Sequence, residues 1–205
     1  MGAFRRQFEN FFGSTVFPAT PEFLAVHGLS AADYGRFDVA TQYNLPAVVH
    51  IEGLDFQYRQ ALTFLPAWAR GVQVIASGAS QRISGVEADN FNGMIPRTAS
   101  LGLVLTRPRF NVRANWTYQS ERKLAQINGL SVGPGTFTYA TPRRLVDVNA
   151  EFHLTRRVSL FGNIRNWGDE PEDFERRGPL TPDRARFRQS DRYGALWIFG
   201  LRGNF

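Results

Sequence analysis

Residues 109–119 read Arg-Phe-Asn-Val-Arg-Ala-Asn-Trp-Thr-Tyr-Gln, a run in which polar and apolar side chains alternate without interruption. Successive side chains of a β-strand point to opposite faces, so this run predicts a strand with one apolar and one polar face. Residues 145–154 repeat the pattern, because Val146, Val148 and Phe152 alternate with charged and amide side chains. Two such segments indicate an antiparallel sheet whose faces meet different surroundings.

Six further segments show the same period of two less sharply. They are residues 3–12, 48–64, 72–84, 98–106, 158–166 and 193–205. Together with the first two they predict about eight strands. The best helical candidate is a short turn within residues 21–35, inside a long loop. The chain is therefore predicted to be all-β.

The connections between these strands alternate in length. Residues 13–43, 120–142 and 167–192 form long connections, residues 85–97 an intermediate one, and residues 65–71, 107–108 and 155–157 short ones. In an antiparallel meander this order places the long loops at one end of the sheet and the short turns at the other. Outer-membrane β-barrels are built in this way. The pattern predicts antiparallel transmembrane strands in a partial barrel or an open curved sheet.

The composition of the 205 residues narrows the possible functions. The chain has no cysteine, which excludes disulfides and any site built on a thiol. Its 24 Lys and Arg residues outnumber 18 Asp and Glu residues, but they are scattered singly or in pairs, so nucleic-acid binding is not expected. No stretch approaches the ~20 apolar residues of a transmembrane helix. Any membrane contact would be made by strands.

Few residues suggest enzymatic or metal chemistry. His27, His50 and His153 are far apart in the sequence, and no nucleophile or phosphate-binding motif occurs. We therefore predict no catalytic residue, no metal site, no cofactor and no enzymatic activity. The acidic run at residues 169–175 lacks the spacing of a calcium loop and is followed at once by two arginines. It is predicted to be a solvated loop.

Residues 159–173 read Ser-Leu-Phe-Gly-Asn-Ile-Arg-Asn-Trp-Gly-Asp-Glu-Pro-Glu-Asp. This stretch resembles the penultimate strand of TonB-dependent outer-membrane receptors and the turn after it. Residues 192–205 look like their terminal strand with its closing Gly-x-Phe, and residues 51–58 are similar to an earlier strand motif. The resemblance spans residues 2–205.

This resemblance implies a location in the bacterial outer membrane, with membrane lipid as a partner. It implies TonB-dependent uptake of a scarce nutrient such as a siderophore, cobalamin or an oligosaccharide, while the substrate-binding residues stay unknown. It also implies that the last strand is the signal read by the barrel-assembly machinery. The residues of that signal are Tyr193, Trp197, Phe199, Leu201 and Phe205.

Several parts of that family cannot be found in this sequence. A signal peptide, a TonB box and a plug domain are missing, and the full barrel has about 22 strands. Residues 1–205 are therefore expected to be the C-terminal portion of the barrel domain, connected to TonB only through the missing N-terminal region. The charged residues of the polar face are expected to line the lumen; they are Arg109, Arg113, Asp147, Glu151, Arg165 and Arg202.

Two alternatives stay open. The chain could be a complete eight-stranded outer-membrane protein with a structural or adhesive role, although its charged inner face would have to fill a narrow interior. It could also be a soluble β-barrel or sandwich that binds a ligand. A requirement for detergent would separate the soluble alternative from both membrane interpretations.

Overall fold

The computed structural model describes residues 1–86, 88, 91–127, 132–133 and 135–203. Within these residues the fold is all-β with antiparallel pairing, and the strands form sheets of eight, four and two strands. This confirms the all-β fold class and the antiparallel pairing. The eight-stranded sheet is called the main sheet below.

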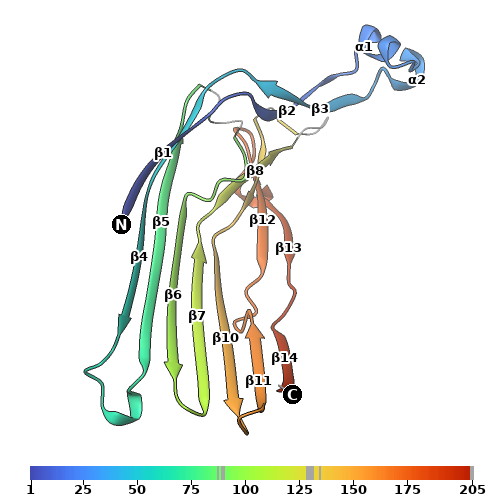
Figure 1. Cartoon of the computed structure of the whole chain (residues 1–205). Helices are drawn as coiled ribbons and strands as arrows, with labels where there is room; N and C mark the ends of the chain where they lie inside the picture. The colour runs from blue at the N-terminus through green and yellow to red at the C-terminus, as the bar shows by residue number, and fades with distance from the viewer. Residues whose placement is uncertain (87, 89–90, 128–131, 134, 204–205) are drawn as a thin grey trace.

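The main sheet contains every strand that the alternating segments predict. Figure 1 shows these strands side by side in chain order. They are β1 (Gly2–Phe8), β4 (Val49–Ala61), β5 (Val72–Ser84), β6 (Arg97–Thr106), β7 (Phe110–Gln119), β10 (Arg143–His153), β11 (Val158–Arg165) and β14 (Leu196–Gly203).

The first predicted strand ends earlier in the structure, and the last predicted strand begins later, than the sequence predicts. Asn10 takes a positive φ of 52°, which ends the first strand, so Phe12 belongs to β2 (Phe11–Pro18) instead. Gly194 takes a φ of 74°, and Tyr193 therefore precedes β14 rather than extending it. A left-handed backbone cannot continue a strand, which explains both breaks.

The main sheet is curved and open. Among the described residues no backbone pairing joins β1 to β14, so these two strands are its edges. The N-terminal strand β1 and the C-terminal strand β14 accordingly lie at opposite edges of the sheet in Figure 1. Of the two forms expected from the sequence, the structure shows the open curved sheet.

Connection lengths are segregated as the sequence predicts. Short connections join β4 to β5, β6 to β7 and β10 to β11, all at the lower end in Figure 1. In the last of these, the Thr155 hydroxyl accepts hydrogen bonds from the amides of Arg157 and Val158, which fixes a tight turn. The longer connections leave the opposite end, here called the loop end.

The first long connection holds a hairpin and two short helices. β2 pairs with β3 (Asp38–Leu45), and α1 (Pro21–Val26) and α2 (Ala31–Tyr34) lie at its tip. Thr20 and Ser30 cap the two helices through their hydroxyls, and Pro21 occupies the first turn of α1. The predicted helical turn is confirmed, whereas the hairpin around it was not predicted.

The other two long connections build a second sheet at the loop end. Its strand order is β13 (Phe187–Asp191), β12 (Glu172–Arg177), β9 (Phe137–Ala140) and β8 (Arg122–Gln126). This sheet is called the loop sheet below. The prediction of a solvated acidic loop is wrong, because Glu172, Asp173 and Glu175 are half-buried residues of β12. Pairing with β9 and nearby arginines make this placement possible.

Candidate functional site

Strand register collects the apolar side chains of the main sheet on one side, here called the apolar face. It comprises the even-numbered residues of β4, β5, β7, β10 and β11 and the odd-numbered residues of β1, β6 and β14. Across its middle, Trp116 lies between Leu101 and Val146, and the same row continues to Ala76 and Tyr58. Along this row the apolar surface is continuous across β4, β5, β6, β7 and β10.

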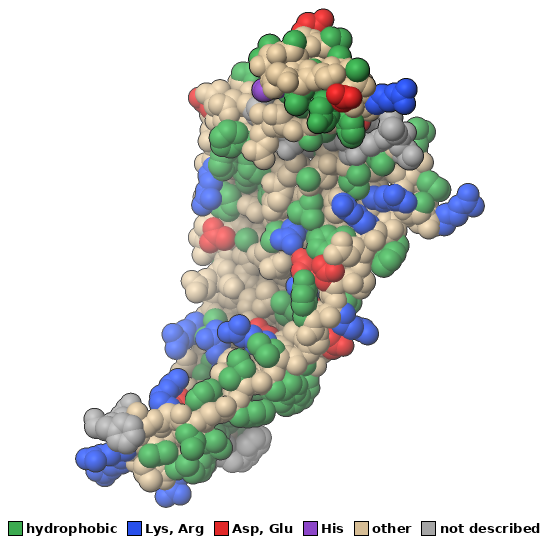
Figure 2. Space-filling view, turned by 90° about the vertical axis from the view of Figure 1, so that its right-hand side faces the viewer, with side chains coloured by type: hydrophobic (Ala, Val, Ile, Leu, Met, Phe, Trp, Pro, Cys, Tyr) green, Lys and Arg blue, Asp and Glu red, His purple; other side chains and the backbone are tan. Residues whose placement is uncertain are grey.

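Large apolar side chains of this face are left uncovered. Leu54 is 63% exposed, Phe199 67% and Leu201 69%. In the lower part of Figure 2, hydrophobic side chains run along one side of the sheet while Lys and Arg side chains gather on the other. A soluble monomer rarely exposes a contiguous apolar surface of this kind. The face requires an apolar medium or a partner.

The opposite side of the main sheet, here called the polar face, carries hydrogen bonds between side chains of adjacent strands. The Arg59 guanidinium donates to Gln73 over 2.8 Å. At the other edge, the Ser159 hydroxyl donates to Glu151 over 2.7 Å, and Arg202 lies 3.6 Å from the same carboxylate. These bonds fix side chains on adjacent strands into one polar layer.

The register places the predicted inner charges on the polar face, with one exception. Arg109 precedes β7 and lies in the turn. The residues placed on the polar face are Arg113, Asp147, Glu151, Arg165 and Arg202.

The predicted C-terminal signal residues are brought together only in part. Trp197, Phe199 and Leu201 share the apolar face of β14, and the rings of Trp197 and Phe199 are 6.2 Å apart. Tyr193 lies before the strand, beyond the backbone kink at Gly194, and Phe205 lies outside the described residues. The three strand residues form an aromatic and aliphatic stripe on β14, an edge strand that pairs only with β11 among the described strands.

Ion pairs join the loop sheet to the main sheet. The Glu172 carboxylate accepts hydrogen bonds from Arg122 over 2.8 Å and from Arg143 over 3.1 Å. Arg143 is the first residue of β10. The Glu172 carboxylate of β12 therefore bonds both to β8 of the loop sheet and to a strand of the main sheet. The partners are 50 and 29 residues from Glu172, and no local pattern could have revealed them.

A second ion pair cluster lies beside the first. Arg177 is 2.7 Å from both Glu121 and Glu175. Partial burial lowers the pKa of Arg177, but hydrogen bonds to Glu175 and Glu121 outweigh this effect and raise the pKa above its ordinary value. The guanidinium therefore stays charged and continues to hold the two carboxylates.

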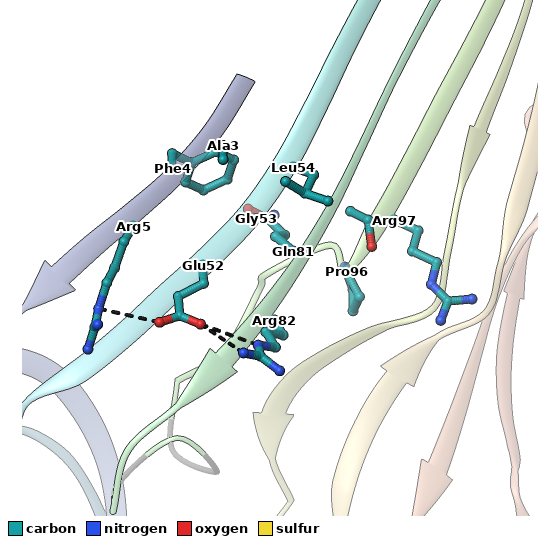
Figure 3. A pocket seen from close by; sticks show the side chains of 11 residues that line it. Ala3, Phe4, Arg5, Glu52, Gly53, Leu54, Gln81, Arg82, Pro96 and Arg97 are labelled. Atoms are coloured by element: carbon teal, nitrogen blue, oxygen red, sulfur yellow. Dashed lines mark hydrogen bonds and ion pairs between the residues drawn. The ribbon is translucent and has the colours of Figure 1, made fainter. Parts of the chain in front are cut away.

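A cavity of about 740 Å³ opens at the loop end, beside the first strands of the main sheet. Figure 3 shows its charged residues in a row across β1, β4, β5 and β6. Glu52 lies 3.4 Å from Arg5 and 3.0 Å from Arg82. The guanidinium of Arg97, at the end of the row, has no hydrogen-bond or ion-pair partner among the described residues. Sequence reasoning did not single out this cluster.

Two kinds of feature are absent from the part of the chain that the structure describes. No cluster of three or more His, Asp or Glu residues there could hold a metal ion. None of the helices formed by those residues has the length and hydropathy needed to cross a membrane.

No protein-family model matches the chain, and no curated protein or solved structure matches it either. The likeness to TonB-dependent receptors consequently rests on the motifs quoted above.

Proposed function

We propose that the chain forms the lipid-embedded part of a bacterial outer-membrane receptor barrel. The observation that carries this proposal is the strand register, which places most large apolar side chains of the main sheet on one face and most polar side chains on the other. Transmembrane β-barrels alternate lipid-facing apolar residues with polar residues of the lumen in this manner. In this arrangement the apolar face contacts acyl chains and the polar face lines a water-filled interior.

Strand lengths support a membrane location for the central strands. A transmembrane strand requires about 9–11 residues. β4 and β5 each have 13 residues, β6 and β7 have 10, and β10 has 11. The strands of the loop sheet have only four to six residues, which fits a position outside the bilayer.

The two open edges favour a wider barrel. In lipid each unpaired backbone group costs several kcal/mol, because no water is present to replace the missing hydrogen bond. β1 and β14 would therefore have to pair with further strands. This supports the proposal that the chain supplies eight adjacent strands of a larger barrel, with the long connections at the cell surface.

The role in uptake comes from the family resemblance. A TonB-dependent receptor performs no covalent chemistry; it binds a scarce nutrient through its loops and plug, and TonB drives its passage. The proposed substrate classes are siderophores, cobalamin and oligosaccharides. The polar face and loop sheet would supply only part of the binding surface, so the chain is expected to require the rest of the receptor for transport.

The membrane proposal can be tested with paired single-cysteine variants, because the chain has no cysteine of its own. Val112→Cys and Val148→Cys place a label on the apolar face; Arg113→Cys and Asn149→Cys, their chain neighbours, place it on the polar face. Each variant of the full chain is labelled with a fluorophore and folded into phosphatidylcholine vesicles containing a nitroxide lipid. We expect strong quenching for the first pair and weak quenching for the second. Equal quenching at neighbouring positions would contradict the proposal.

The receptor role is tested separately in the host bacterium. A strain lacking the coding sequence is grown with ferric siderophores, cobalamin or oligosaccharides as the limiting nutrient. We expect slower growth on one of these nutrients and recovery when the gene is restored. Unchanged growth on all of them would exclude the proposed uptake of these substrates.

A further inference from the structure

Charged side chains interrupt the apolar face at its loop end. On the four adjacent strands β1, β4, β5 and β6 they are three arginines, Arg5, Arg82 and Arg97, and one carboxylate, Glu52. Three positive charges against one negative charge leave two positive charges uncompensated. Charged side chains on a lipid-facing surface are costly unless they lie near the interface, where anionic groups are available. The cluster therefore needs an anionic partner.

Arg82 and Arg97 are the members most accessible to such a partner. The side chain of Arg82 is 81% exposed although it bonds Glu52, and Arg97 has no partner among the described residues. Arg97 lies directly opposite Ser80, so Arg82 is its diagonal neighbour on the same face, at a spacing of about 7–8 Å. Two long guanidinium side chains at this spacing can reach one anion placed between them.

An apolar groove continues directly from this charged cluster. A second cavity of about 420 Å³ shares Leu54, Ser80 and Arg97 with the first and extends along Phe56 and Tyr118. Leu54 is 63% exposed and Phe56 43%. Gly78, opposite Phe56, adds no side chain of its own to the surface. A positively charged end followed by an apolar groove is complementary to a lipid with an anionic head group and an apolar tail.

The geometry points to a binding site for an anionic phospholipid at this position, an inference that rests on the proposed membrane location. The phosphate lies at Arg82 and Arg97, and an acyl chain follows the groove along Leu54 and Phe56. Guanidinium groups bind phosphate oxygens in pairs of charge-assisted hydrogen bonds, which suits arginine to this task. A free phosphate ion would use the arginines but leave the groove empty, so charge and shape together favour a lipid.

The test uses the full chain with a fluorophore on Leu101→Cys, a position of the apolar face outside both cavities. The labelled chain is folded into phosphatidylcholine vesicles that contain spin-labelled phosphatidylglycerol or, at the same mole fraction, spin-labelled phosphatidylcholine. We expect the anionic lipid to quench more strongly. Arg97→Gln should lower its relative affinity about fivefold, and Arg97→Lys should restore it only in part, because lysine keeps the charge but loses the paired hydrogen bonds. The guanidinium of Arg97 has no hydrogen-bond or ion-pair partner among the described residues, so neither variant removes such a bond there.

Arg113→Gln on the polar face is the matched control and should leave the lipid preference unchanged. Equal quenching by both lipids in the unsubstituted chain would overturn the lipid site while leaving the membrane proposal intact. Absence of quenching by either lipid would instead overturn the membrane proposal. Loss of the preference when inorganic phosphate replaces chloride at equal ionic strength would show a site for free anions and would also overturn the lipid site.

Discussion

The ring of Phe199 lies so close over Gly162, its direct cross-strand partner, that a Cβ on the glycine would stand 3.0 Å from two ring carbons. The next pair along the strands is reversed, because Phe161 lies over Gly200 on the polar face. β11 and β14 each carry a Phe-Gly dipeptide, and antiparallel pairing sets each phenylalanine against the glycine of its neighbour. The rings thus fill the space and cover the backbone that the glycines leave open.

The first prediction concerns another pair of this kind, Phe4 and Gly53. A Cβ on Gly53 would stand 2.6 Å from the Phe4 ring and 2.8 Å from the carbonyl oxygen of Ser80. That oxygen belongs to the paired backbone of β5 and cannot move without disturbing the sheet. We expect Gly53→Ala to lower the free energy of unfolding by about 1–3 kcal/mol, measured by urea titration of the chain in vesicles.

Gly162→Ala is the matched control for that variant. Its Cβ would meet only the ring of Phe199, which is 67% exposed and can turn outward. The loss of backbone freedom in the unfolded chain also favours alanine. Gly162→Ala should therefore have a small effect. Similar destabilisation by both substitutions would show that contact with backbone is not the deciding factor.

The second prediction tests the two faces energetically. Val148 lies between Ala114 and Ile164 in the middle of the apolar face. Val148→Arg should cost about 2–4 kcal/mol if this position is near the bilayer midplane. Asn149→Arg places the same side chain on the polar face and should be mild. Heat-modifiable gel mobility after folding into vesicles measures the folded fraction, and equal damage by the two substitutions would contradict the assignment of the faces.

Much of the fold could be predicted because the main sheet has a local signature. Each long strand alternates over many residues, as in residues 109–119, and its period of two is visible without knowledge of its neighbours. The separation of long and short connections follows from strand order alone. The faces of individual residues were predicted for the same reason, as Val112 and Arg113 illustrate.

The parts that were not predicted depend on pairing between distant segments. β9 has only four residues and becomes a strand because β8 and β12 flank it. The acidic run was read as solvated because its arginine partners, Arg122 and Arg143, lie in other parts of the chain. The row of Arg5, Arg82 and Arg97 is invisible in the sequence, since the four strands β1, β4, β5 and β6 must assemble before these residues become neighbours.

The third prediction concerns the ion pairs of Glu172. Glu172→Gln removes the charge that Arg122 and Arg143 share, and these arginine side chains are only 33% and 23% exposed. We expect a loss of about 1–2 kcal/mol, confined to the loop sheet. Hydrogen exchange should show faster opening of β8, β9 and β12 while β4 to β7 stay protected.

Asp183→Asn serves as the control for this change. Asp183 pairs with Arg186, but its side chain is 88% exposed, so the pair contributes little to stability. Its substitution should leave exchange in the loop sheet unchanged. If Glu172→Gln accelerated exchange equally in the main sheet, the two sheets would behave as one cooperative unit and the expected local effect would be excluded.

The fourth prediction follows from the open edges at β1 and β14. These strands have seven and eight residues, and roughly half of the backbone groups of each point away from the sheet. At several kcal/mol for each unpaired group in lipid, the total reaches tens of kcal/mol, well above the ~5–15 kcal/mol by which a domain is usually stable. We expect the 205-residue chain, refolded alone into vesicles, to insert only as an oligomer associated through these edges and not as a monomer. Cross-linking and protease protection distinguish the states. A protease-resistant monomer would show that β1 and β14 close on each other, and the small eight-stranded barrel would then be the better account of this protein.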